Sequence, residues 1–323
     1  MSNSEPQTRR RFLAATAAAT GVAGLAGCLG DDEQATDEGM TDDEMTDEMT
    51  DEMTDDGMTD EDSMGAHTVE YAFEALPELD AGHYEGWAVF GEETLSTGTF
   101  QPGDETTFEV DRDLGRADRF VVTVEPDESM TDGPSDVVVL AGDLMGSEAA
   151  LSFPVDLSAA AGSYILATPT NGGGTDETAG VWFLDPEAGP GPSLDLPEPP
   201  TGWTYEGWAV TQGTPISTGR FRDPTAADDF DGYSGDEAAP DFPGEDLLRN
   251  APDGVSFPPD LADGSSTVVV TVEPDVDGMD PTGGSPFPIE PLVGDVPADA
   301  ADHTSYDLAA DDQRVPSGTA TVS

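Results

Sequence analysis

The hexapeptide Tyr-Glu-Gly-Trp-Ala-Val at residues 84–89 is the most informative stretch of the sequence, because an identical copy stands at residues 205–210. Aromatic and β-branched side chains are frequent in it, which favours a β-strand. A segment repeated without change indicates two related domains in one chain. Matching aromatic positions in both copies need only a shared fold, so we interpret them as core residues. These predicted core residues are Tyr84, Trp87, Tyr205 and Trp208.

Two further segments recur downstream of the hexapeptide. Ser-Thr-Gly-Thr-Phe at 96–100 matches Ser-Thr-Gly-Arg-Phe at 217–221, and Val-Val-Thr-Val-Glu-Pro-Asp occurs at 121–127 and at 269–275. The spacing shows that the second repeat carries extra residues between these two segments, at 223–264. This insert is rich in Asp, Pro and Gly, which predicts a long surface loop.

Other stretches also have the composition of short strands bounded by Gly, Pro, Asn and Asp. Many such strands, with no convincing helical period, favour a mainly β protein. We expect two tandem small β-sandwich or open-barrel domains, the first at 67–160 and the second at 161–323. The predicted strands are 84–89, 120–124, 137–140, 164–167, 181–184, 205–210 and 267–272.

The segment 1–27 has the pattern of an export signal rather than of a membrane-spanning helix. A basic stretch precedes an apolar, Ala-rich run, and its Arg pair resembles a twin-arginine signal. The run ends in Leu-Ala-Gly-Cys, which is typical of a lipobox, so we expect a lipid on Cys28. The protein would then be extracytoplasmic and anchored to the outer face of the cell membrane. The signal residues are Arg9, Arg10, Phe12 and Leu13.

A segment built on the unit Met-Thr-Asp-Glu follows, and residues 28–66 are predicted to be a disordered acidic tether. It is too poor in large apolar side chains to offset the entropy of ordering. An alternative use is copper binding, because the thioethers of Met45, Met49 and Met53 would share one helical face and suit Cu(I).

The chain has 69 acidic residues against 10 basic ones, a formal net charge of −59. Phosphates would be repelled, which argues against nucleic acid as a partner. Absent Lys and abundant Asp resemble proteins of extreme halophiles, in which concentrated salt screens self-repulsion. With 1 Cys the chain has no intrachain disulfide and no multi-Cys metal site.

The order of motifs in each repeat resembles the extracytoplasmic C-terminal domain of anti-sigma-K factors. Leu-Pro, a Gly turn, Tyr-x-x-Trp, Ser-Thr-Gly-x-Phe and Val-Thr-Val-Glu-Pro follow one another at 76–126 and again at 196–274. The resemblance covers about 67–323, twice over, and implies a small β-rich domain of sensor type outside a membrane. Family members also have a zinc-containing sigma-binding domain and one transmembrane helix. Neither pattern occurs in this sequence, so we expect no sigma factor as partner.

We expect a non-enzymatic binding, sensing or structural module whose partner is a protein or glycan at the cell surface. The sequence contains no Gly-x-Ser-x-Gly, phosphate-loop or dinucleotide motif. A hydrolase that uses paired carboxylates is one alternative, because so many acidic residues single none out.

A divalent-cation site is the other alternative. Asp229-x-Asp231-Gly and Asp275-x-Asp277-Gly-x-Asp280 place carboxylates close together beside a Gly turn, which suits a hard cation such as Ca²⁺. Neither stretch completes an EF-hand loop, and solvated acidic loops are the simpler interpretation. We expect no other cofactor.

Overall fold

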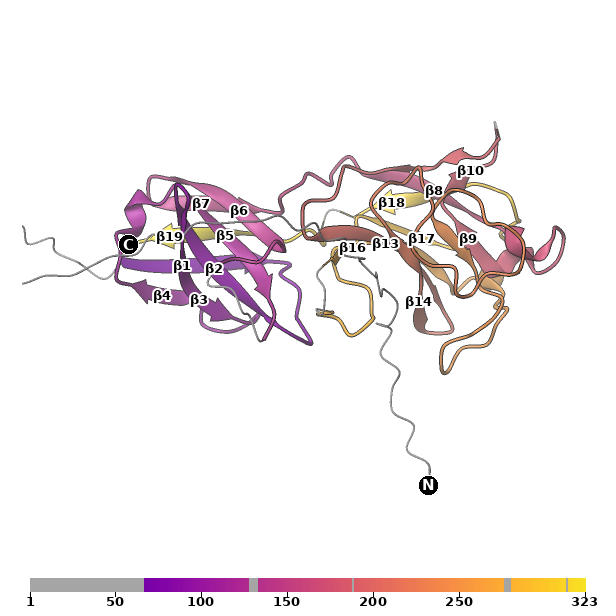
Figure 1. Ribbon diagram of the computed structural model, residues 1–323, viewed down its shortest axis with the longest axis horizontal. Helices are drawn as coiled ribbons and strands as arrows, with labels where there is room; N and C mark the ends of the chain where they lie inside the picture. The colour runs from indigo at the N-terminus through magenta and orange to yellow at the C-terminus, as the bar shows by residue number, and fades with distance from the viewer. Residues whose placement is uncertain (1–66, 128–132, 188, 276–279, 312) are drawn as a thin grey trace, which may run out of the picture. The chain divides into compact units, whose positions relative to one another are not determined.

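The computed structural model describes residues 67–127, 133–187, 189–275, 280–311 and 313–323. This part of the chain forms two nearly closed, antiparallel β-barrels, here called barrel 1 and barrel 2 (Figure 1). None of the helices found there is long and apolar enough to cross a membrane.

Several predictions concern residues outside the described part of the chain. They are the export signal at 1–27 with Arg9, Arg10, Phe12 and Leu13, the lipidation at Cys28, the tether at 28–66 with Met45, Met49 and Met53, and Asp277 of the second cation motif.

Barrel 1 has eight antiparallel strands in the order β3-β2-β5-β6-β7-β19-β1-β4. The end strands β3 and β4 contact each other, which nearly closes the sheet. Its strands are β1 (His67–Glu74), β2 (His83–Phe90), β3 (Glu93–Phe100), β4 (Thr107–Val110), β5 (Arg119–Glu125), β6 (Val138–Met145), β7 (Glu148–Ser152) and β19 (Ser317–Val322).

Barrel 2 has the corresponding order β14-β13-β16-β17-β18-β8-β9-β15, and the short β12 (Leu194–Asp195) also pairs with β8. A separate two-stranded sheet joins β10 (Leu184–Asp185) to β11 (Gly191–Pro192). The barrel strands are β8 (Ala161–Leu166), β9 (Gly180–Trp182), β13 (Trp203–Thr211), β14 (Thr214–Phe221), β15 (Gly244–Asp246), β16 (Thr267–Pro274), β17 (Leu292–Asp295) and β18 (Tyr306–Ala310).

The expected mainly β fold with two small domains is confirmed, and each predicted strand overlaps an observed one. The helices in the described residues are single 3-10 turns between strands. They are η1 (Leu114–Arg116), η2 (Pro169–Asn171), η3 (Glu177–Ala179) and η4 (Leu261–Asp263).

The repeated hexapeptide forms β2 and β13, and in both barrels the pairing with the next strand shifts by one residue immediately before the tryptophan. The extra residue of each bulge lies on that next strand, Thr97 on β3 and Thr218 on β14, and the shift follows Gly86 and Gly207. A Cβ on Gly86 would lie 2.6 Å from the Thr97 hydroxyl, so no larger residue fits without a shift. Trp87 and Trp208 are both buried, as are the tyrosines three residues earlier. The local register and the burial of these tyrosines and tryptophans are therefore the same in both repeats.

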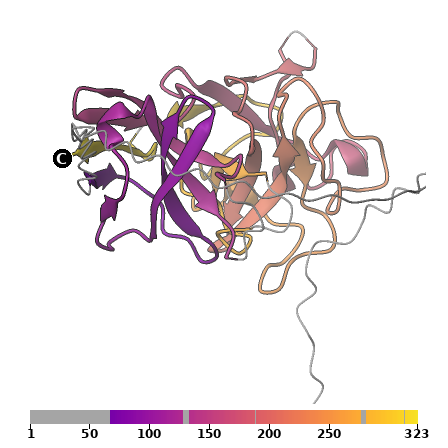
Figure 2. The ribbon, with the colours of Figure 1, turned by 60° about the vertical axis from the view of Figure 1, so that its left-hand side comes forward.

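The boundary between the domains differs from the predicted one. The last strand, β19, pairs with β7 and β1 and completes barrel 1 instead of the second domain (Figures 1 and 2). Figure 2 shows this strand, in yellow, among the indigo and magenta strands of barrel 1. Barrel 2 therefore spans 161–310 and is inserted between two strands of barrel 1, whereas the sequence suggested a domain at 161–323.

The insert at 223–264 is more than the surface loop that its composition suggests. It supplies β15, which pairs with β9 and closes barrel 2 against β14. It also contributes the buried side chains of Tyr233 and Leu247 to the core. A strand of three residues is too short to show a period of two, which explains why the sequence did not reveal it.

Candidate functional site

A chain of hydrogen bonds lies behind the repeated tryptophan. In barrel 1 the Trp87 ring N–H donates to Thr123 Oγ1 at 2.9 Å, and the Thr123 hydroxyl donates to Glu125 Oε1 at 2.5 Å. The same carboxylate oxygen accepts the backbone N–H of Ser135 at 2.7 Å. The chain thus ties β2 and β5 to the segment that leads into β6.

Barrel 2 repeats this chain with Trp208, Thr271 and Glu273, at 2.8 and 2.5 Å. Here the backbone N–H of Phe287 donates to Glu273 at 2.7 Å. A buried polar network that is present in both copies is explained by the shared fold. Function is better sought where the two barrels differ.

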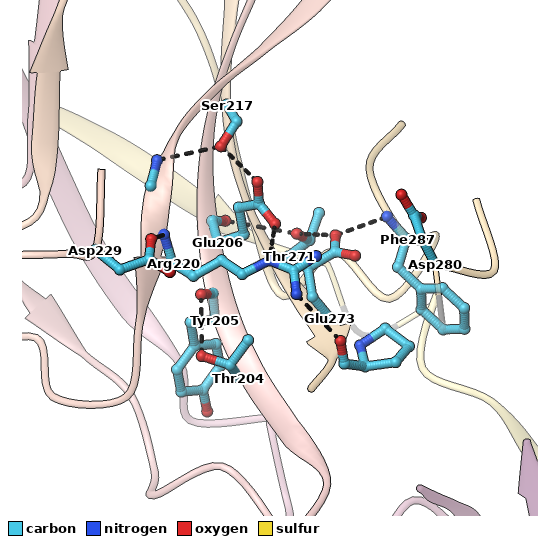
Figure 3. Close-up of polar contacts among 12 residues, drawn as sticks. Thr204, Tyr205, Glu206, Ser217, Arg220, Asp229, Thr271, Glu273, Asp280 and Phe287 are labelled. Atoms are coloured by element: carbon cyan, nitrogen blue, oxygen red, sulfur yellow. Dashed lines mark hydrogen bonds and ion pairs between the residues drawn. The ribbon is translucent and has the colours of Figure 1, made fainter. Parts of the chain in front are cut away.

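The first difference is Arg220 on β14, which stands opposite Glu206, whereas barrel 1 has Thr99 opposite Glu85. Arg220 Nε donates to Glu206 Oε2 at 2.8 Å, and the Ser217 hydroxyl donates to the other oxygen of that carboxylate at 2.5 Å. Figure 3 shows the Arg220 side chain extending toward Glu206 and Glu273. Barrel 2 therefore holds a largely buried ion pair that barrel 1 lacks.

Burial sets the protonation of this cluster. It raises the pKa of Glu206, although Arg220 acts in the opposite direction. Burial, and then the charge of Glu206, raise the pKa of Glu273 to about 8. A protonated Glu273 beside the Glu206–Arg220 pair avoids two like charges in a site with little water.

A cleft of about 410 Å³ opens beside Arg220. The first residues of the insert form one wall, and the Arg220 backbone N–H donates to Asp229 Oδ1 at 2.8 Å. Asp275 lies at the other side, 4.0 Å from Arg222. The cleft therefore brings together one residue from each of the two Asp-Gly motifs. Its charged lining residues are Arg220, Arg222, Asp223, Asp228, Asp229 and Asp275.

A second hollow of about 360 Å³ lies under the insert, lined by Asp228, Asp231 and Ser234 among others. Close to it, burial raises the pKa of Asp228 to about 7 and that of Glu245 to about 8. Ser234 links the hollow to the core, because its hydroxyl donates to Glu245 Oε1. The insert thus carries two carboxyl groups whose raised pKa values favour the protonated form near neutral pH.

Glu245 takes the place of a partly buried aromatic residue that packs against the core of barrel 1. In barrel 1, Phe108 lies opposite Val69 and packs on Tyr71; in barrel 2, Glu245 lies opposite Val181 at the corresponding position. Glu245 is fully buried, and its Oε2 has no hydrogen-bond partner among the described residues. Asp246 beside it is fully engaged, since it accepts bonds from Thr170 and from the Trp182 ring.

One further group combines a histidine with two carboxylates. His303 Nε2 lies 4.0 Å from Glu177 Oε2, and His303 Nδ1 lies 4.0 Å from Asp302 Oδ2. One potential ligand atom from each residue lies within 4.8 Å of the other two. Glu177 is held in place by the Thr168 backbone N–H at 3.1 Å. The sequence did not single out this group because Glu177 is far along the chain from the adjacent Asp302 and His303.

The predicted cation residues are otherwise dispersed. Asp231 faces the second hollow, whereas Asp280 is exposed and accepts the Thr282 backbone N–H at 3.3 Å. No three of the predicted residues that the structure describes form a group with metal-ligand spacing. Sequence reasoning missed Arg220, although it is the one residue that changes between the two copies of Ser-Thr-Gly-x-Phe.

Comparison with known proteins identifies part of the chain. Residues 13–138 match the family described as anti-sigma-K factor rskA, C-terminal. Barrel 1 therefore contains an RskA C-terminal-like domain. The match covers less than half of the chain and ends at the first residue of β6, so barrel 2 is not assigned to a family. No curated protein and no solved structure matches the chain.

Proposed function

We propose that this protein is a lipid-anchored, extracytoplasmic surface protein that binds a ligand through barrel 2 without catalysing a reaction. The observation that carries the proposal is the contrast between the repeats. Both barrels share the tryptophan network, but the insert, Arg220 and the adjoining cleft belong to barrel 2. Barrel 1, which contains the RskA C-terminal-like domain, would then have a structural role, and barrel 2 would bind the ligand.

The lining of the cleft indicates the chemistry of the ligand. Four carboxylates and two guanidinium groups surround it, and each guanidinium already contacts a carboxylate or backbone carbonyl oxygen. The groups that are left to contact a ligand are therefore mainly the Asp side chains, which accept hydrogen bonds and attract cations. A protein segment with basic side chains or a polyhydroxylated glycan fits this lining.

Capture from a cell-surface extract in multimolar KCl tests the proposal. The full chain is compared with a cleft variant, Asp229→Asn with Asp275→Asn, and with a control, Glu92→Gln with Glu105→Gln, whose residues are exposed on barrel 1. We expect a partner that is retained by the wild type and the control and lost by the cleft variant. Equal retention by all three proteins would contradict a binding role for the cleft.

The anchor is tested separately, because it rests on the sequence pattern at Cys28. In the native host the wild type is expected in the detergent phase of a membrane extract, and Cys28→Ser in the aqueous phase. A mass increase on Cys28 would identify the lipid. Recovery of both proteins in the aqueous phase would contradict the anchor.

Divalent-cation binding is a second candidate function, favoured by the spacing of Glu177, Asp302 and His303. An imidazole with two carboxylates suits Zn²⁺ better than Ca²⁺. Titration with Zn²⁺ at fixed ionic strength should raise the melting temperature of the wild type but not of His303→Ala. The same titration with Ca²⁺, using Asp229→Asn, tests the Asp-Gly loops. A flat response to both ions removes this candidate.

A further inference from the structure

The second hollow, under the insert, carries polar side chains that accept hydrogen bonds. Three of them are the carboxylates of Asp228, Asp229 and Asp231, which only accept hydrogen bonds when they are ionised. A fourth is the hydroxyl of Ser234, whose proton is donated to Glu245, so that its lone pairs are left for a ligand. A ligand that fills this hollow must therefore bring hydrogen-bond donors, and a positive charge would complement its acids.

Three aromatic side chains line the same hollow, namely Trp182, Phe230 and Phe242. The indole of Trp182 is held from two sides. Its ring N–H donates to Asp246 Oδ1 at 2.8 Å, and its Cε3 lies 2.8 Å from where a Cβ on Gly244 would stand. Aromatic rings attract cations that carry apolar carbon, because the ring faces are electronegative and the carbon packs on them. The hollow therefore offers an organic cation both a charge partner and an apolar surface.

The acids beside this hollow occupy a place that is aromatic in barrel 1. There the Phe108 ring lies against Gly98, 2.3 Å from where a Cβ on this glycine would stand. In barrel 2 the equivalent Gly219 has the Asp228 carboxyl at 2.3 Å instead. Glu245 holds the strand position that corresponds to Phe108. Two carboxyl groups therefore replace one phenyl ring of the shared fold, and they are more than a consequence of the acidic composition.

Glu245 has an unpaired carboxylate oxygen beside the second hollow. Its side chain is fully buried, and Oε2 has no hydrogen-bond partner among the described residues. The side chain extends toward the hollow, because Ser234 holds the other oxygen. Burial raises the pKa of Glu245, and nearby acids that include Asp228 and Asp231 raise it further. A buried acceptor without a partner is costly, and a donor with a positive charge would stabilise this oxygen and the ionised acids around it.

The spacing of the acids and the volume of the hollow select the kind of cation. Among the described residues, three ligand atoms of His or acidic side chains lie within 4.8 Å of one another only at Glu177, Asp302 and His303. The acids of the hollow are therefore too far apart to share a metal ion in that geometry. The hollow measures about 360 Å³, which lies in the range of sites for small organic ligands.

We propose that the second hollow binds a primary ammonium or guanidinium group on an alkyl chain, with its N–H groups directed at the carboxylates and its carbon against the aromatic rings. A free organic cation and a basic side chain of a partner protein share this chemistry. The inference goes beyond the proposed function, because Asp231 and Phe242 line this hollow and not the cleft beside Arg220.

Calorimetric titration of the full chain with n-butylammonium in multimolar KCl tests this proposal. Asp231→Asn removes a charge from the hollow, and Phe242→Leu keeps apolar volume but removes an aromatic ring. Asp253→Asn is the control, because Asp253 is exposed on the same insert and does not line the hollow. We expect saturable binding by the wild type and the control, and at least several-fold weaker binding by both hollow variants. 1-Butanol, a neutral molecule of the same length, should not bind.

A melting curve of each variant shows that it is folded before titration. Absence of saturable binding by the wild type, or equal affinity in Asp231→Asn and Asp253→Asn, would overturn the proposal. Tighter binding of Ca²⁺ than of n-butylammonium at fixed ionic strength, lost in Asp231→Asn, would also overturn it, because the hollow would then be a metal site.

Titration with an acetylated and amidated lysine peptide distinguishes the two sources of the cation. Tighter binding of the peptide than of n-butylammonium would indicate a side chain of a partner protein. Equal or weaker binding of the peptide would indicate a free organic cation.

Discussion

Thr97 and Thr218 occupy the same place in the two barrels, but their hydroxyls have different surroundings. The Thr97 hydroxyl is 2.8 Å from the Tyr71 hydroxyl. Thr218 lies beside Phe183 instead, as the neighbours of Gly207 show, and its buried hydroxyl has no partner among the described residues. Barrel 2 thus has Phe183 where barrel 1 has Tyr71, and this change leaves the buried Thr218 hydroxyl unsatisfied among the described residues.

Valine substitutions should have opposite effects at these two sites. Thr218→Val removes an unsatisfied hydroxyl and should raise the free energy of unfolding by about 1 kcal/mol. Thr97→Val leaves the Tyr71 hydroxyl without its partner and should lower it by about 1–2 kcal/mol. Urea unfolding in concentrated KCl measures both values. Destabilisation by Thr218→Val as large as that by Thr97→Val would contradict this account.

Glu245 should make the stability of barrel 2 depend on pH. Burial raises the pKa of Glu245 to about 8 in the folded protein, so folding favours the protonated form. Its stabilising contribution is complete below the unfolded pKa, near 4.5, and is lost as the pH rises through about 8.

Between pH 6 and 9, this group should lower the free energy of unfolding by about 2 kcal/mol. Glu245→Gln keeps the shape of the protonated carboxyl group. It should therefore remove the part of the pH-dependent loss of stability that Glu245 causes. Glu109→Gln, on the corresponding strand of barrel 1, is exposed and should leave the decline unchanged. Urea midpoints across this pH range provide the measurement, and identical curves for both variants would disprove the role of Glu245.

At the scale of elements, the tryptophan network joins strands to the segments between them. Thr271 on β16 both accepts from the Trp208 ring and donates to Glu273, which in turn holds the backbone of Phe287. One hydroxyl therefore connects β13, β16 and the segment before β17. The matching bulges and networks explain why the hexapeptide recurs unchanged.

Thr271→Val should lower the free energy of unfolding by about 2–3 kcal/mol, because it leaves the buried Trp208 ring N–H unpaired and removes one of the two hydrogen bonds to Glu273 Oε1. It should also increase proteolytic cleavage within 281–289, where Glu273 holds the backbone of Phe287. Thr267→Val on the same strand is the control, since Thr267 is only half-buried and its contact with Asp295 is a long one, 3.3 Å. An equal loss of stability in the two variants would argue against the network.

At the scale of the whole molecule, net charge dominates. With 69 acidic and 10 basic residues, few acids find a cationic partner, and the remaining ones repel one another in dilute salt. A rise from 0.2 to about 3 M KCl reduces the screening length to a few Å and should raise the melting temperature by about 10 °C or more. Calorimetry measures this change.

A variant with reduced charge separates this effect from a general salt effect on apolar burial. Five exposed acids whose side chains make no hydrogen bond within the described part of the chain would be replaced by their amides. The variant should be more stable than the wild type in 0.2 M KCl and equal to it in concentrated KCl. An equal salt response in both proteins would show that charge is not the cause. The five residues are Glu92, Glu105, Asp111, Glu148 and Asp253.

Parts of the candidate site were accessible from the sequence. The Asp-Gly motifs led to Asp229 and Asp275, which line one cleft, and the change to Arg220 could be seen by aligning the two repeats. Glu245 could not be recognised, because nothing local distinguishes it among 69 acidic residues. Its burial follows from the pairing of a three-residue strand with β9, which is a long-range contact.

The repeat, the mainly β character and the buried tyrosine and tryptophan positions could be predicted, since they follow from local composition and from two copies of one pattern. That β8 completes barrel 2 and β19 completes barrel 1 became evident from the folded chain. Gly162 and Gly318 stand opposite equivalent leucines, so the backbone hydrogen bonds alone do not favour one connection over the other. The packing of each whole barrel makes that choice.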